Sequence, residues 1–150
     1  MTTQVVVTGT GVPNVSPGRA GPGVLVRHHD TLLQFDAGRA TTLRLAEVGV
    51  ATGELTSLFV THHHSDHLVG LQDLLFTRWL ENHGHHTPLP VVAPAGPSIT
   101  YLERMMDPWN ADIAVRAGHV GRTDHPAPRI VPFDPGPTIA GPVEVHWLEG

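Results

Sequence analysis

Short apolar runs, each ended by glycine, proline or a polar cluster, are spaced along the whole chain. Their length and their β-branched content are typical of β-strands. The predicted strands are the opening QVVVTGTG, residues 24–27, residues 31–35, LTSLFV, LPVVAP, residues 129–133 and PVEVHWLE.

Between these runs, apolar residues recur at three- and four-residue spacing, which marks the buried face of a helix. One helix is predicted after the polar residues 61–67 that follow LTSLFV, with its buried face formed by Leu68, Leu71, Leu75 and Trp79. The segment RATTLRLAEVG predicts a helix that ends at Gly49. GPSITYLERMM predicts another, with Ser98 as a candidate N-cap. In the Pro-, Gly- and Arg-rich region 107–137 we expect only the strand at 129–133.

Strands and helices therefore alternate, which predicts an α/β layered architecture. A chain of 150 residues is the size of one domain, and neither an internal repeat nor a linker divides it. We expect a single domain over residues 1–150. No apolar run is long enough to cross a bilayer, and the start lacks the basic-then-apolar order of a signal peptide. A cytoplasmic location without membrane contact is expected.

The composition limits the chemistry that the chain can perform. The sequence contains no cysteine, so a metal would have to be held by imidazole and carboxylate. The net charge is −5, and all nine basic residues are scattered arginines, so the composition does not itself predict a nucleic-acid surface. A fold could still gather distant arginines into one groove.

The densest polar cluster is THHHSDHLVGL, at residues 61–71. In an extended segment alternate side chains point the same way, so His62 and His64 form a pair and His63 points away. Asp66 and His67 follow at the turn into the helix and can reach a second point close by. This spacing supplies two ligands to each of two neighbouring metals, an arrangement suited to hydrolysis. The alternative is a group of surface histidines at a strand end, which would leave imidazoles beside a buried strand with nothing to bind.

Three segments and their order resemble the metallo-β-lactamase fold hydrolases, most closely the ribonuclease Z branch. They are TGTGVPN, LLQFDAG and LFVTHHHSDHLVGLQDLL. The resemblance covers about the first half of the chain and continues more loosely through TPLPVVAPAGP. It implies an αββα sandwich of the metallo-β-lactamase type, with the metals at the edge between the two sheets.

The resemblance also implies roles for individual residues. His62 and His64 match ligands of a first metal, and Asp66 and His67 match ligands of a second, with Zn²⁺ expected at both and Mn²⁺ or Fe²⁺ as alternatives. Asp66 is also the candidate for handling a proton. Asp36 matches an aspartate that hydrogen-bonds near the site. Its other interpretation is a helix N-cap for the following segment, and both roles can hold at once.

Some parts of the family pattern lie beyond this sequence. A third histidine, a bridging aspartate and a last histidine would follow the strand PVEVHWLE, in which we expect His146 to face solvent. We therefore expect an N-terminal portion of a longer hydrolase, truncated after the first half of the sandwich, with one apolar sheet face uncovered. Alone, it should bind metal weakly and hydrolyse slowly or not at all. The second cluster, His83, His85 and His86, is interpreted as solvated histidines at a helix end.

The function implied by the resemblance is metal-dependent hydrolysis of a phosphodiester. The typical reaction of the branch is endonucleolytic trimming of the 3′ end of precursor transfer RNA, which makes RNA the expected partner. Two alternatives stay open. One is hydrolysis of a small ester, lactone, sulfate or cyclic nucleotide with the same metals, and the other is a metal-binding fragment without catalysis. A homodimer is compatible with the sequence.

Overall fold

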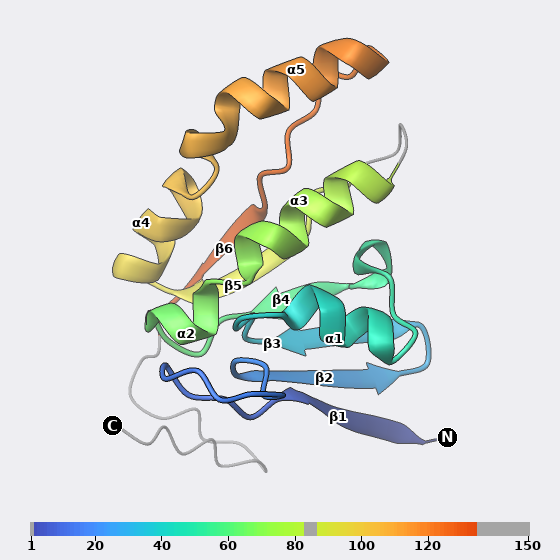
Figure 1. Ribbon diagram of the computed structural model, residues 1–150, viewed down its shortest axis with the longest axis vertical. Helices are drawn as coiled ribbons and strands as arrows, with labels where there is room; N and C mark the ends of the chain where they lie inside the picture. Colours follow the sequence, from blue (N-terminus) through green and yellow to red (C-terminus); the bar gives the residue numbers. More distant parts are fainter. Residues whose placement is uncertain (1, 83–86, 135–150) are drawn as a thin grey trace.

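The computed structural model describes residues 2–82 and 87–134, and these residues form one sheet with helices on it (Figure 1). The spatial order of the six strands follows their order in the chain. β1 to β3 are antiparallel, and β3 to β6 are parallel. The strands are β1 (Thr3–Gly9), β2 (Gly23–His28), β3 (Thr31–Phe35), β4 (Ser57–Phe59), β5 (Pro90–Pro94) and β6 (Arg129–Phe133). All six coincide with predicted strands.

The helices lie mainly in the connections between the parallel strands. They are α1 (Thr41–Glu47), α2 (Ser65–Leu68), α3 (Leu71–Glu81), α4 (Pro97–Arg104) and α5 (Asn110–Val120), with short 3-10 turns η1 (Thr52–Glu54) and η2 (Asp107–Trp109). The three crossovers step across the sheet in the same direction. Because such crossovers are right-handed, α1, α3 and α4 are placed on the same face of the sheet. Among the described residues, no helix is both long and apolar enough to span a bilayer.

The core lies between this helical layer and the sheet. Leu25, Leu58 and Val91 alternate with outward-facing neighbours along their strands and are fully buried. They belong to one cluster with Leu75 and Trp79 of α3. The predicted apolar face of this helix is therefore confirmed, because burial of these large side chains is what holds α3 against the sheet.

The opposite face of the sheet is also apolar. The strand register aligns one residue from each strand into a single row: Val7, Val24, Phe35, Phe59, Val92 and Val131. The rings of Phe35 and Phe59 stack with centroids 5.0 Å apart. At the β1 end of this face, Val5 and Val7 are about 60% exposed (63% and 59%). This row is the apolar face that the sequence predicts, and none of the crossover helices covers it.

Three predictions about helices were wrong. The single helix predicted to contain Leu68, Leu71, Leu75 and Trp79 is divided at Gly70 into α2 and α3. Ser98 is buried within α4, whose N-cap position is occupied by Gly96. The third error is α5, for which no helix was predicted. Only Ile113 of α5 is buried, and the Pro-, Gly- and Arg-rich composition of this region suggests irregular structure. The following Arg122 ties the end of this helix to α3 by donating to the carbonyl of Trp79 at 2.7 Å and stacking over its ring.

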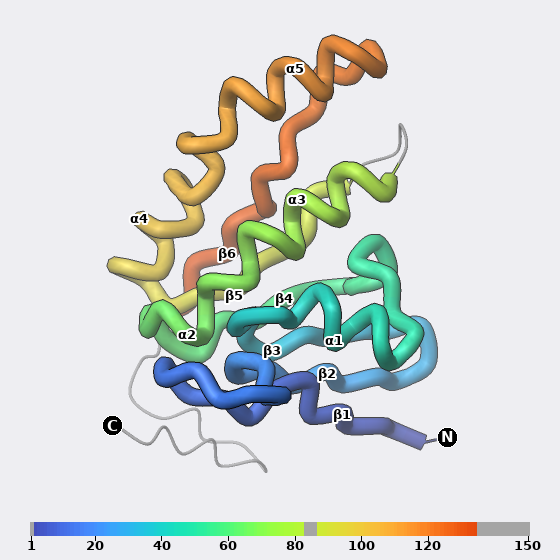
Figure 2. The backbone as a smooth tube through the Cα atoms, in the orientation of Figure 1, coloured from blue at the N-terminus to red at the C-terminus, as the bar shows by residue number. Residues whose placement is uncertain are grey.

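Three segments pack closely where β3 and β4 end (Figure 2). They are the loop at 10–22, the turn at 36–40 and residues 65–70, which include α2. Ala37 donates to the carbonyl of His67, and Gly70 donates to that of Ala37, both at 2.8 Å. A Cβ on Gly70 would overlap the carbonyl oxygen of Gly38. These two backbone hydrogen bonds thus hold residues 65–70 against the residues that follow β3.

Replacing Gly70 with alanine should therefore destabilise the protein. The added Cβ meets backbone, which cannot rotate away, so we expect a loss of at least about 2 kcal/mol in the free energy of unfolding. Gly118→Ala is the matched control, because nothing lies within 4 Å of its added Cβ. Within a helix that change should raise stability by roughly 0.5–1 kcal/mol. Urea unfolding measures both, and equal stabilities for the two variants would contradict the close contact.

Candidate metal centre

The polar cluster lies at one edge of the sheet because β3 and β4 are parallel neighbours. Asp36 directly follows β3, and Thr61 comes two residues after β4. Asp36 has a left-handed backbone (φ 56°), which is uncommon outside glycine. Two hydrogen bonds hold this kink. The amide of Asp36 donates to the carbonyl of Phe59 at 2.7 Å, and the side chain of Gln34 donates to the carbonyl of Asp36 at 2.8 Å.

Three histidine rings gather at this edge. The centroid of His62 lies 4.5 Å from that of His64 and 4.1 Å from that of His67. The carboxylate of Asp66 is buried beside them, with Oδ2 3.8 Å from Nε2 of His67. The sequence predicts two separate pairs of ligands. In the structure these four side chains form one group, here called the histidine cluster, in which the ring of His62 lies beside both other rings.

His63 lies at the margin of this group. It is exposed, as His64 is, and its ring contacts the ring of His64, at 5.4 Å. The described aromatic contacts place it against neither His62 nor His67. A change at His63 can therefore be compared with a change at His62 to separate loss of any nearby imidazole from loss of a member of the histidine cluster.

The carboxylate of Asp36 is the common partner of the cluster and of the preceding loop. Its Oδ1 accepts the backbone N–H of Thr61 at 2.8 Å, and its Oδ2 lies 2.7 Å from Nδ1 of His67. The hydroxyl of Thr61 lies 2.9 and 3.0 Å from the two oxygens. The helix N-cap interpretation of Asp36 was wrong, since the N-cap position of α1 is Ala40 and no side chain caps that helix. No role of Thr61 is predicted by the spacing of the histidines.

The environment of His62 favours its neutral form. Burial lowers the pKa of His62, and positive charge on His67 and His64 lowers it further, while Asp36 and Asp66 act in the opposite direction. Desolvation disfavours an imidazolium, so the balance is downward. A neutral imidazole is the form that binds a divalent metal.

The donor set fits a zinc-like divalent metal in its chemistry. It consists of imidazoles and one carboxylate, and the Nδ1 atoms of His62 and His67 are engaged by Thr61 and Asp36, which leaves their Nε2 atoms for a ligand. Within residues 2–82 and 87–134, however, no three histidine, aspartate or glutamate side chains come close enough to hold an ion by themselves. The described residues thus offer part of a site. His146, His83, His85 and His86 lie outside the described residues.

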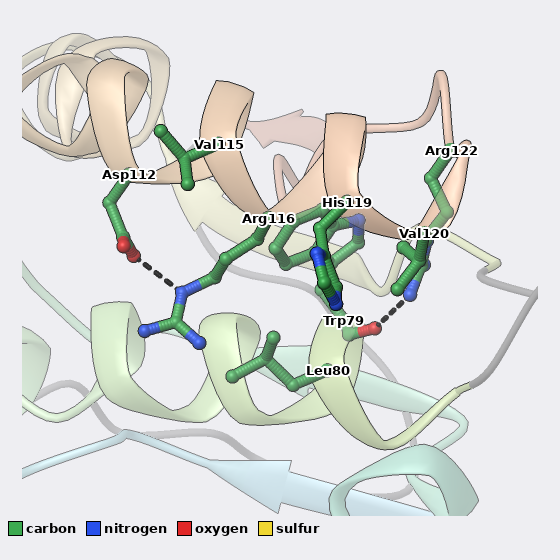
Figure 3. Close-up of a pocket in the computed structure, with 8 residues that line it drawn as sticks. All are labelled: Trp79, Leu80, Asp112, Val115, Arg116, His119, Val120 and Arg122. Atoms are coloured by element: carbon green, nitrogen blue, oxygen red, sulfur yellow. Dashed lines mark hydrogen bonds and ion pairs between the residues drawn. The ribbon is translucent and has the colours of Figure 1, made fainter.

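A separate hollow of about 610 Å³ lies between α3 and α5 (Figure 3). Trp79 and Leu80 line it from α3, and Val115 and His119 line it from α5. Arg116 points into it while donating to Asp112 at 2.8 Å. No residue of the histidine cluster lines this hollow, so it is a gap between two helices and does not belong to the candidate metal centre.

Known proteins are similar to this chain over most of its length. A ribonuclease Z of Mycobacterium sp. (strain KMS) is 36% identical over 143 residues, which are 95% of this chain and 45% of the relative. The chain thus spans less than half the length of that relative.

Two solved structures share the arrangement of strands and helices. Human tRNase Z, short form, superposes with a TM-score of 0.62 at 30% identity, over 72% of this chain and 39% of the other. The metallo-β-lactamase fold protein YhfI from Bacillus subtilis superposes with a TM-score of 0.67, over 93% of this chain and 48% of the other. Its 19% identity supports the fold alone.

A family model with the description "Anti-Pycsar protein Apyc1" matches residues 3–95, which is more than half of the chain and includes the histidine cluster and Asp36. The chain therefore belongs to the family of the anti-Pycsar protein Apyc1, as a ribonuclease Z-like member of the metallo-β-lactamase fold.

Proposed function

We propose that this chain provides the N-terminal part of a metal-dependent phosphodiesterase that trims the 3′ end of precursor transfer RNA. The observation that carries the proposal is the histidine cluster at the ends of β3 and β4. The carboxylate of Asp36 contacts the ring of His67 in this cluster. The curated relatives named ribonuclease Z support RNA as the substrate. We place the reaction in the cytoplasm, and a homodimer stays a prediction.

In this proposal His62, His64, Asp66 and His67 hold divalent metal, with Zn²⁺ expected. A metal held there would act as a Lewis acid on a phosphodiester. Asp36 fixes the orientation of His67 by accepting its Nδ1–H. Asp66 is the candidate for moving a proton, because its carboxylate is buried next to Nε2 of His67.

A second candidate is hydrolysis of a small phosphodiester such as a cyclic nucleotide. One observation is compatible with it. The net charge of −5 and the absence of lysine offer no strongly basic surface to an RNA backbone. The two candidates share one metal centre and differ in the size of the substrate.

The first test concerns the metal. In protein expressed from the complete reading frame, His62→Ala should lower the affinity for Zn²⁺ by more than the roughly 10–100-fold that loss of an outer hydrogen-bond partner costs. His63→Ala is the matched control, because His63 is exposed and, among the described aromatic contacts, its ring touches neither His62 nor His67. Isothermal titration calorimetry measures both affinities. Equal losses in the two variants would contradict the assignment of His62.

The second test concerns the substrate. The same protein, loaded with Zn²⁺, should remove the 3′ extension of a precursor transfer RNA, and chelation of the metal should abolish cleavage. Because RNA binding displaces counterions, the KM for this substrate should rise steeply with salt concentration. A cyclic nucleotide assayed in parallel should be a poor substrate. Hydrolysis of the cyclic nucleotide without cleavage of the RNA would overturn the RNA assignment in favour of the second candidate.

A further inference from the structure

The hydroxyl of Thr61 lies between two groups of the candidate metal centre. Its Oγ1 is 2.9 Å from Nδ1 of His62 and 2.9 Å from Oδ2 of Asp36. A threonine hydroxyl has one proton to donate and two lone pairs with which to accept. The position of that single proton therefore decides which nitrogen of His62 carries hydrogen.

The surroundings of Asp36 determine where the proton goes. A carboxylate can only accept hydrogen bonds, and Asp36 already accepts the backbone N–H of Thr61. If the hydroxyl donated to His62, its oxygen would face the oxygens of Asp36 at 2.9 and 3.0 Å with no hydrogen between them. Donation to Asp36 removes this repulsion. The hydroxyl oxygen then accepts, and Nδ1 of His62 must supply the hydrogen.

We propose that Thr61 is a positioning residue that holds His62 as the Nδ1–H tautomer, so that Nε2 presents its lone pair to the cluster. Asp36 imposes the same tautomer on His67 directly, through the contact of 2.7 Å. One carboxylate thus sets both rings, one of them through the hydroxyl of Thr61. The use of Nε2 as a metal ligand rests on the proposed function, whereas the tautomer itself does not.

A purely structural role for Thr61 makes a different prediction. Thr61 also bonds Asp36 through its backbone N–H, which survives any side-chain change. Thr61→Val keeps that bond and the shape of the side chain but removes the hydroxyl. Thr61→Ser keeps the hydroxyl and removes only a methyl group. The two variants separate the hydroxyl from the packing of the side chain.

The experiment measures the tautomers in the metal-free protein by long-range ¹H–¹⁵N correlation, with His62→Ala used to assign the signals. In the wild type and in Thr61→Ser, His62 should carry its hydrogen on Nδ1. In Thr61→Val, His62 should shift toward the Nε2–H form, while His67 should keep Nδ1–H because Asp36 still holds it. The affinity of Thr61→Val for Zn²⁺ should fall by about 10-fold or more, and that of Thr61→Ser should stay close to the wild type.

An Nε2–H form of His62 in the wild type would overturn the inference without any variant, so the test survives even if Thr61→Val fails to fold. An unchanged tautomer in folded Thr61→Val would overturn it as well. Failure of the proposed function has another signature, since the wild type would then show the expected tautomers and bind no Zn²⁺.

Discussion

The carboxylate of Asp36 is the constraint on which the site depends. It connects the ends of two neighbouring parallel strands, because it follows β3 and bonds both the backbone and the hydroxyl of Thr61 beyond β4. It also contacts the ring of His67 after the chain has turned into α2. Buried charge-assisted hydrogen bonds of this kind are stronger than neutral ones. Loss of this carboxylate would leave two loops without the group that aligns them.

The left-handed backbone of Asp36 follows from the same constraint. The kink directs the carboxylate toward the neighbouring strand end and allows the next residues to pack against Gly70. Strained conformations of this kind persist where the surrounding structure over-determines them. Here the backbone bond to Phe59 and the amide of Gln34 hold the turn. These backbone contacts thus fix the place from which the carboxylate of Asp36 reaches Thr61 and His67.

The sheet has two apolar faces, and the described residues cover only one of them with helices. Right-handed crossovers that step in one direction put α1, α3 and α4 together. The row that includes Phe35, Phe59 and Val92 lies on the other face. Such a face is what one half of a two-sheet sandwich would present. This agrees with superpositions that cover less than half of the related chains.

Much of the fold could be read from the chain because it depends on local pattern. All six strands follow from short apolar runs, and the buried face of α3 follows from apolar periodicity. The spacing of His62, His64, Asp66 and His67 marks the candidate site. α5 could not be read in this way, because it buries only Ile113 and its attachment to α3 depends on Arg122.

The sequence alone thus determined which residues form the sheet and which side chains gather at its edge. The single grouping around His62, and the part played by Thr61, were decided by tertiary structure. Residues 36 and 61 are distant in the chain, and only the parallel pairing of β3 with β4 brings the carboxylate and the hydroxyl within hydrogen-bonding distance.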